Sequence, residues 1–353
     1  MTLLLSVLLA LSIPSSSPDV PNRQPQAAAL GNKVAVVYAS GNSIQLALST
    51  DGGKTFSGPA ALPNKDMLAA GMHRGPRVVF TSPTSLVVSA IVRGAHNQAA
   101  GHNQSSGNLV AWRSSDSGKT WSEPVRVNDV AEAAREGLHA MAGNGKVVYA
   151  SWLDLRDKGT KLYGSVSRDG GATWSANHLV YESPDGTICQ CCHPSVDVAA
   201  DGSVRVMFRN VVAGNRDMYV AESADAKTFS AAKKVGEGSW KFEACPMDGG
   251  SLARDSKGGV VAVYRRESTV FLKTPSAAEK ALDGGKNPAA VATSKGVYAV
   301  WQKGEGLEMW IPGATKPTTL DEHGAFPALV ALSDGTALAV WENKGTIEVR
   351  QLK

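Results

Sequence analysis

The chain has 353 residues, of which 43% are hydrophobic and 19% are charged, and its formal net charge is +4 at pH 7. This composition is typical of a soluble globular protein, and the length suits one large repeat domain or two ordinary ones. Because the net charge is slight and Lys and Arg form no long run, we expect neither nucleic acid nor an anionic membrane surface as a partner.

The N-terminal stretch 1–14 is almost wholly apolar, with the run LLLSVLLAL at 3–11, and PSSSP follows at 14–18. It is too short to span a bilayer and is typical of a secretory signal peptide. No Lys or Arg precedes the run and no A-x-A site follows it, so a poorly ordered apolar tail is the alternative. We expect residues 1–18 to be a signal peptide and 19–353 to form one domain. The protein would then be secreted or periplasmic, with no membrane contact after signal removal.

Short apolar strands recur along the rest of the chain. Each copy has an apolar run, a turn that mostly contains Gly, and a second run that usually ends in an aromatic residue. Seven copies begin near residues 23, 75, 137, 193, 245, 287 and 326. Their lengths and turns are typical of β-hairpins, and no segment has a sustained helical period. The sequence therefore predicts an all-β protein.

A second motif lies between some of these copies. The segments STDGGKTF at 49–56, SSDSGKTW at 114–121 and SRDGGATW at 167–174 fit the pattern S-x-D-x-G-x-T-W/F, and SADAKTF at 223–229 is a shorter copy. Ser and Asp can bond backbone N–H groups within a tight turn, and Gly takes a positive φ there. The motif resembles the Asp-box, or BNR repeat, of sialidase-like β-propellers, and the chain is similar to an uncharacterised bacterial exo-α-sialidase-like branch of them.

The resemblance implies a β-propeller with Asp-box repeats over nearly the whole chain. Hairpin repeats of this length cannot bury both faces alone, so we expect them to stack around an axis. The repeat count predicts seven blades, and six blades, as in catalytic sialidases, are the alternative. The last strand, at 346–350, is expected to complete a blade shared with the N-terminal region and so to close the ring.

In such a propeller, the starts of the inner strands and the loops after the second strands meet at one mouth of the channel. Arginines gather at these positions: Arg23, Arg74, Arg93, Arg156, Arg209 and Arg265. Because a guanidinium can bind a carboxylate through two parallel hydrogen bonds, we expect them to bind an acidic sugar of a glycan or another small anionic ligand. RQP at 23–25 resembles the R-I-P segment of sialidases, whose Arg grips the substrate carboxylate. A ring of salt bridges between blades is the structural alternative.

The catalytic residues that the resemblance implies have no match at the same positions. Sialidases carry an Asp acid/base where this chain has SGNS at 40–43, and a Tyr nucleophile in the final blade, where only Tyr298 is available, inside a predicted strand. Glu136 and Asp154 are the candidate substitutes. Without a poised acid and an activated nucleophile, glycosidic cleavage loses most of its acceleration. For Asp154 and Arg156, an ion pair that caps a strand within its blade is an equal alternative.

The four cysteines lie in two places, CQCCHP at 189–194 and CPMD at 245–248. In an exported protein two disulfides are the plain expectation. The alternative is a copper or zinc site made by Cys189, Cys191, Cys192, His193 and Cys245, because thiolates and imidazole suit these ions. Free or redox-active thiols are the third possibility. No other cofactor is expected.

These observations predict a sialidase-like, exported, glycan-active protein that binds an acidic sugar at the propeller mouth. Hydrolysis by an exo-glycosidase mechanism stays open. A non-catalytic binding or assembly propeller is one alternative, and a metal or thiol protein that uses the cysteines is the other. No oligomeric state is predicted.

Overall fold

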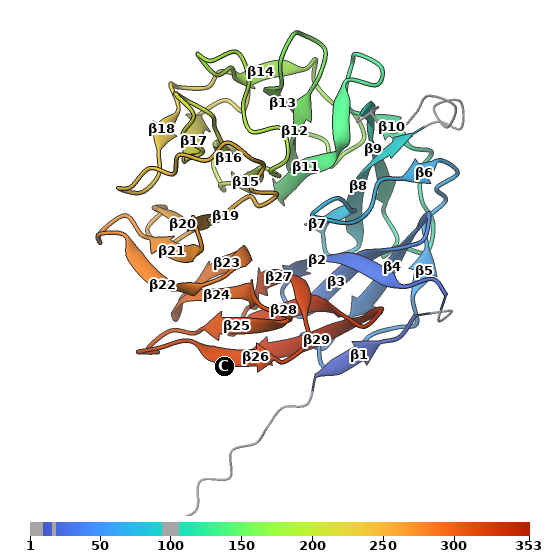
Figure 1. The fold of residues 1–353 in the computed structure, drawn as a ribbon. Coiled ribbons are helices and arrows are strands. Elements are labelled where there is room, and N and C mark those ends of the chain that lie inside the picture. Colours follow the sequence, from blue (N-terminus) through green and yellow to red (C-terminus); the bar gives the residue numbers. More distant parts are fainter. Residues whose placement is uncertain (1–9, 16–18, 94–105) are drawn as a thin grey trace, which may run out of the picture.

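The computed structural model describes residues 10–15, 19–93 and 106–353 (Figure 1). Within these ranges the secondary structure consists of strands and turns, so the described part offers no helix that could cross a membrane. The sheets form a ring, with β2, β7, β11, β15, β19, β23 and β27 towards its centre (Figure 1). Each of these inner strands contacts the next one around the ring, and β27 contacts β2. The chain is thus an all-β propeller, as predicted.

Five sheets of the ring have four antiparallel strands each. They are β2 (Asn22–Leu30), β3 (Lys33–Ser40), β4 (Ser43–Ser49) and β5 (Ala60–Ala61); β15 (Ser195–Val198), β16 (Val204–Arg209), β17 (Met218–Ser223) and β18 (Lys233–Lys234); β19 (Ser251–Arg254), β20 (Val260–Arg266), β21 (Thr269–Lys273) and β22 (Lys280–Gly284); β23 (Lys286–Thr293), β24 (Gly296–Lys303), β25 (Gly306–Trp310) and β26 (Thr318–Asp321); and β27 (Ala325–Ala331), β28 (Ala337–Asn343), β29 (Thr346–Leu352) and β1 (Leu11–Ile13).

The remaining sheet joins two successive repeats and has nine strands. It contains β6 (Met67–Leu68), β7 (Arg77–Ser82), β8 (Ser85–Arg93), β9 (Ser106–Ser114), β10 (Val125–Arg126), β11 (Ala134–Asn144), β12 (Val147–Asp154), β13 (Lys161–Ser167) and β14 (His178–Tyr181). Its junction is the start of β11, where Ala134 pairs with Gly107 and Arg135 with Ser106 of β9.

The expectation of seven separate blades, or of six, is therefore wrong: five blades are separate and the second and third repeats share one sheet. The physical reason is a shift of register within β11. Ala134 still pairs with Asp154 of β12, but the regular ladder with β12 resumes only at His139. Gly137, between them, takes a positive φ of 71°. The first residues of β11 can thus bond the neighbouring repeat as well as their own.

The N-terminal region closes the ring, as the sequence predicted for the last strand. Leu11, Ser12 and Ile13 pair antiparallel with Val349, Glu348 and Ile347. A second closure joins the first and last sheets, because the Gln24 backbone N–H and side-chain amide both donate to Oε1 of Glu342. β1 lies within the stretch 1–18 that the sequence predicts as a signal peptide. That role stays a prediction, and residues 1–9 and 16–18 lie outside the described residues.

Hydrophobic side chains fill the spaces between neighbouring sheets. The largest buried ones include one indole near the end of each of four second or third strands: Trp112, Trp152, Trp301 and Trp341. Each such ring removes about 150–250 Å² from water, which favours folding by roughly 4–6 kcal/mol before entropy is counted. The core therefore consists of several clusters packed between sheets and arranged around the axis.

The Asp-box turns have the local structure that their residues predict. In the first copy, Ser49 Oγ donates to Asp51 Oδ1 at 2.7 Å and accepts from the Gly53 N–H at 2.9 Å. Thr55 donates to the same carboxylate through its backbone N–H at 3.0 Å and its hydroxyl at 2.6 Å. Gly53 has a φ of 84°. The copies at 114–121, 167–174 and 223–229 repeat the Ser–Asp–Thr contacts.

We expect these turns to lose their stabilising contribution in acid. Hydrogen bonds from the Thr120 hydroxyl and backbone hold the pKa of Asp116 at about 2. Since this pKa is depressed in the folded state, its stabilisation is present above the unfolded pKa of about 4 and is lost as the pH falls towards 2. Asp116→Asn should therefore flatten the dependence of the urea midpoint on pH between 4 and 2. Glu123→Gln, at an exposed position just after the same turn, should leave it unchanged. An Asp116→Asn profile that matches the parent would contradict this.

Candidate functional site

The strand directions separate two faces of the ring. The inner strands begin, and the second-to-third-strand turns lie, at one face, which we call the mouth. The Asp-box turns follow the third strands and lie at the opposite face. The predicted site residues can therefore form one binding site only where their side chains meet at the mouth or in the channel.

One groove opens at the mouth between the loop after β18 and the turns after β20 and β24. We call it the Trp240 groove. Its volume is about 640 Å³, and it is lined by Trp240, Phe242, Arg265, Glu267, Ser268, Gly285, Lys286, Gln302 and Gly304. Two of these residues are cationic and one is anionic, so the groove suits a ligand that carries negative charge.

Aromatic rings form one wall of the groove. Trp240 is 6% exposed and Phe242 is half-buried, and their rings stack at 4.8 Å with an angle of 21° between the planes. The guanidinium of Arg265 lies 5.1 Å from the Trp240 ring centroid, and that of Arg209 lies 5.3 Å from it. Arginine stacked on indole is held in a defined orientation.

The Arg265 side chain is fixed at its inner edge and lines the groove. Its Nε donates to the Glu267 carbonyl at 2.7 Å, and its Nη1 lies 3.5 Å from Asp248 Oδ2. Asp248 is fully buried, and burial raises the pKa of its carboxyl although Arg209 and Arg265 lower it. Its Oδ2 also accepts the Asn287 backbone N–H at 3.1 Å. The carboxyl thus holds the arginine from behind, on the buried side.

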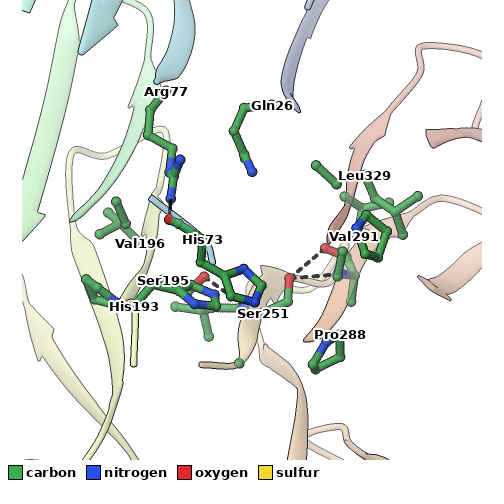
Figure 2. Close-up of a pocket in the computed structure, with 18 of the residues that line it drawn as sticks. Gln26, His73, Arg77, His193, Ser195, Val196, Ser251, Pro288, Val291 and Leu329 are labelled. Atoms are coloured by element: carbon green, nitrogen blue, oxygen red, sulfur yellow. Dashed lines mark hydrogen bonds between the residues drawn. The ribbon is translucent and has the colours of Figure 1, made fainter. Parts of the chain in front are cut away.

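A second, smaller cavity of about 230 Å³ lies in the channel (Figure 2), where inner strands of successive repeats converge. His73 and His193 stack there at 4.2 Å, and His73 Nε2 bonds Asn287 Oδ1 at 2.8 Å. Burial lowers the pKa of His73 to about 4, so the ring is neutral near pH 7. Arg77 donates to the carbonyls of His73, Gly75 and Pro76, which occupies much of its hydrogen-bonding capacity within the wall.

Arg209 has a structural role. It is 1% exposed, and its three nitrogens donate to the backbone carbonyls of Asp248, Arg216 and Arg265. Its guanidinium therefore ties the end of β16 to the adjacent blade and lies behind Arg265. The expectation that Arg209 contacts a ligand directly does not fit these bonds.

The other predicted arginines do not line the Trp240 groove. Arg23 is exposed at the start of β2 and lies near Glu342 of the last blade. Burial raises the pKa of the Glu342 carboxyl, and hydrogen bonds from Gln24 and the charge of Arg23 offset only part of this rise. Arg74 packs against Gly137, where an added Cβ would lie 2.4 Å from the Arg74 Cβ. Arg93 ends β8, next to residues 94–105, which lie outside the described ranges.

Asp154 and Arg156 form the ion pair that the sequence offered as the alternative to a site. Asp154 is 1% exposed and accepts from Trp152 Nε1 at 2.8 Å and from Arg156 Nε at 2.9 Å. Arg156 also pairs with Asp129 at 2.9 Å and stacks over Tyr163 at 4.0 Å. This network caps β12 and does not reach the Trp240 groove. Glu136, the other catalytic candidate, lies in β11, but its side chain is outside the described part.

Three of the four cysteines come together, and we call them the thiol cluster. Sγ of Cys189 lies 3.6 Å from that of Cys191 and 3.2 Å from that of Cys192, and the last two are 3.9 Å apart. All three are buried, whereas Cys245 is exposed. Hydrogen bonds from Cys191 and Cys192 lower the pKa of Cys189, and burial raises the pKa of Cys192. All four cysteines are free thiols in the structure, so the two predicted disulfides are not formed in it.

The sequence reasoning selected Arg265 but missed most of its neighbours in the groove. Trp240, Phe242, Lys286 and Gln302 lie in a loop or at strand ends that no motif covers. The available signal was the pair Trp240 and Phe242, two aromatic residues separated by one position in a segment without strand periodicity. His73 and Arg77 in the channel were also missed, because no motif marks them and only Arg74 was selected from this segment.

Comparison with known proteins places these features in context. Residues 78–337 match the model of the BNR repeat-like domain. Among curated proteins, none matches this sequence. An α-L-arabinanase of Penicillium chrysogenum complexed with arabinobiose is 15% identical, with 98% of each chain covered and a TM-score of 0.61. The α-L-arabinofuranosidase of Fusarium graminearum with an iminosugar inhibitor is 14% identical, with 98% of this chain and 97% of that chain covered and a TM-score of 0.57.

A third solved structure of similar fold is a polysaccharide lyase, an ulvan lyase, bound to -[GlcA(1-4)Rha3S]-. It is 11% identical to this chain, with 96% of this chain and 95% of that chain covered and a TM-score of 0.54. Likeness at such identities shows the fold alone.

Proposed function

Because this chain belongs to the family of BNR repeat-like domains, we propose that it is a glycan-active protein that binds an acidic sugar at the propeller mouth. The observation that carries the proposal is the Trp240 groove, in which an oriented arginine, a lysine and a stacked aromatic pair line one space. The sialidase-like fold and the carbohydrate-active proteins of similar fold support the substrate class.

The chemistry of the groove favours a sugar with a carboxylate. Arg265 can offer a planar pair of N–H donors to two carboxylate oxygens, and Lys286 adds a second positive charge. Phe242 is the half-buried ring of the aromatic pair, and a sugar ring can pack its C–H face on such a surface. Ser268 and Gln302 supply a hydroxyl and an amide for sugar hydroxyls. Sialic and uronic acids both meet these requirements, and the ulvan lyase of similar fold has a glucuronate-containing sugar bound.

Binding is the function we propose, and cleavage is treated as a second readout. Retaining and inverting glycosidases usually need two carboxyls flanking the scissile bond, with opposite tendencies to hold a proton. The Trp240 groove is lined by Glu267, and Asp248 lies behind Arg265 with a raised pKa. This arrangement supplies an exposed carboxylate and a buried carboxyl that is held away from the open groove, so it supports recognition more directly than catalysis.

The test is a calorimetric titration of the full-length protein with sialylated and glucuronate-containing oligosaccharides, each paired with its neutral counterpart. We expect the acidic member of a pair to bind and the neutral one to bind at least tenfold more weakly. Arg265→Lys keeps the charge but loses the paired donors, and charge-assisted hydrogen bonds contribute about 1.5–3 kcal/mol. It should therefore weaken binding about ten- to hundredfold.

Lys257→Ala is the matched control, because Lys257 lies in the turn before β20, at the opposite face of the same blade. It should bind as the parent does. Equal binding of acidic and neutral sugars, or full affinity in Arg265→Lys, would exclude the proposal. Reducing-sugar release in the same samples tests hydrolysis separately.

A further inference from the structure

The thiol cluster has the geometry of a set of metal ligands. Its three sulfur atoms lie 3.2–3.9 Å apart, and they form a group within which every pair of ligand atoms is closer than 4.8 Å. Four thiolates at a Zn–S distance of about 2.3 Å around a tetrahedral ion lie about 3.8 Å from one another. A single central ion could therefore contact all three sulfurs after movements of a few tenths of an ångström.

The surroundings of the thiol cluster suit a buried, charged metal–thiolate group. Arg216 Nη1 donates to Cys189 Sγ at 3.3 Å, and its Nε is bonded to the Phe242 carbonyl at 2.8 Å. Arg209 is buried close by: the Cys189 N–H donates to its carbonyl at 3.1 Å, and the positive charge of its guanidinium lowers the pKa of Cys189 and opposes the rise in the pKa of Cys192. The three buried thiolates with one Cu(I) or Zn(II) would carry a charge of −2 or −1, which these two guanidinium groups offset, and the thiolate of the exposed Cys245 would add one negative charge on the solvent side. A buried charge that is paired in this way is far less costly than an isolated one.

The thiol cluster is also shielded and held in place before any ion binds. Val211 and Met247 pack against the sulfurs and exclude water from one side. The segment is fixed at its start by the Ile188 N–H, which donates to the Thr160 carbonyl at 3.0 Å. Soft sulfur ligands in an apolar pocket select thiophilic ions over Mg²⁺ or Ca²⁺, which prefer oxygen.

Cys245 is the natural fourth ligand. It is exposed and lies two residues before Met247, which packs against the thiol cluster. Its sulfur is not one of the three that lie within 4.8 Å of one another, but its thiol hydrogen-bonds Cys191 and helps to raise the pKa of that thiol. His193, which the sequence also suggested as a ligand, is stacked on His73 in the channel (Figure 2), so its ring is engaged away from the three sulfur atoms. The ligand set is thus all sulfur, with three buried atoms and one that opens to solvent.

We propose that Cys189, Cys191 and Cys192 bind one thiophilic d¹⁰ cation, Cu(I) or Zn(II), with Cys245 as the exposed fourth ligand. The ion enters past Cys245, and each thiol that binds it releases a proton to solvent. The site is separate from the Trp240 groove, although Arg216 contacts both the thiol cluster and the Phe242 backbone. A failure to bind sugars would therefore leave this proposal standing, and the reverse also holds.

The experiment uses the reduced full-length protein under anaerobic conditions. Zn(II) or Cu(I) is added in separate arms, each with a competing chelator, and the desalted protein is analysed for metal content, near-ultraviolet thiolate-to-metal absorption and alkylatable thiols. We expect one equivalent of one of the two ions to survive desalting and to protect at least Cys189, Cys191 and Cys192 from alkylation. The arm that retains metal identifies the ion.

Variants separate the roles of the four thiols. Cys191→Ser should weaken retention at least a hundredfold, Cys245→Ser about tenfold, and Val211→Ala, which keeps every ligand, should retain the ion as the parent does. If Cys191→Ser does not fold, the alkylation pattern of the parent with and without metal gives the same answer. Reduced, folded parent protein that binds neither ion, or binds it without protecting the thiol cluster, overturns the proposal. So does protein that carries two disulfides when freshly purified and takes up no metal after reduction.

Discussion

Replacing Arg209 by methionine is expected to lower the free energy of unfolding by about 3–5 kcal/mol, because a buried cation that donates to three backbone carbonyls is removed from the junction of two blades. The loss has two parts. The carbonyls of Asp248, Arg216 and Arg265 each lose a charge-assisted hydrogen bond, the first at a buried position and the other two at partly buried positions. Asp248, whose carboxyl is buried with Arg209 among its charged neighbours, loses part of its compensation as well.

Arg205→Met provides the control, since Arg205 lies on the same strand, β16, four residues earlier. It pairs with Glu222 at 2.7 Å, but that carboxylate is 46% exposed, so the pair contributes about 1 kcal/mol or less. Urea unfolding of both variants, with the midpoint and the slope measured separately, checks the difference. An Arg209→Met protein within 1 kcal/mol of Arg205→Met would show that the three carbonyls find water or new partners.

The stability of the protein is expected to fall steeply as the pH drops from 6.5 towards 4, and His139→Gln should remove part of that fall. Burial lowers the pKa of His139 to about 3 and that of His73 to about 4, both below the usual value. Between these values and about 6.5, the unfolded chain binds protons that the folded chain does not. The stabilisation that comes from keeping these histidines neutral is therefore fully present above pH 6.5. Below it, the free energy of unfolding decreases by about 1.4 kcal/mol per pH unit for each such histidine.

Gln at 139 can keep a hydrogen bond to the Ser89 hydroxyl, which lies 3.0 Å from His139 Nε2, but it does not titrate. The slope of the unfolding free energy against pH should then decrease by about 1.4 kcal/mol per unit between pH 6 and 4. His323→Gln, at a histidine whose side chain is 53% exposed, should leave the slope as in the parent. Parallel profiles for the parent and His139→Gln would contradict the assignment. The window lies above that of the Asp-box carboxylates, so the two effects can be separated.

The fold could be predicted because it depends on features that repeat. Hairpin strands and the Asp-box recur along the chain, and each copy makes its own local bonds, such as those of Asp51 and Thr55, without help from distant residues. The sharing of one sheet by two repeats could not be predicted in the same way. It depends on the backbone of Ala134 and Arg135 at a shift of register, which leaves no mark in the pattern of apolar residues.

The sequence predicted a residue of the candidate site only where a charged residue lies at the mouth end of a predicted strand. Arg209 and Arg265 both lie at the ends of second strands, β16 and β20, and nothing in their spacing tells that one bonds backbone carbonyls while the other lines a groove. Trp240 and Phe242 lie in a loop whose path is set by tertiary contacts, among them the Phe242 carbonyl with Arg216. The thiol cluster was predictable as a group of residues because its three members lie within four positions, but its geometry was not.

The shared sheet also changes how the ring comes apart. In a propeller made of independent blades, each blade can open on its own and breaks only side-chain contacts with its neighbours. Here the second and third repeats are also joined by backbone pairing of Ala134 with Gly107 and of Arg135 with Ser106, so neither can leave the ring without breaking these pairs. We infer that these two repeats open and refold as one cooperative unit, the largest in the ring. The single separate blades would then be the places where local opening starts.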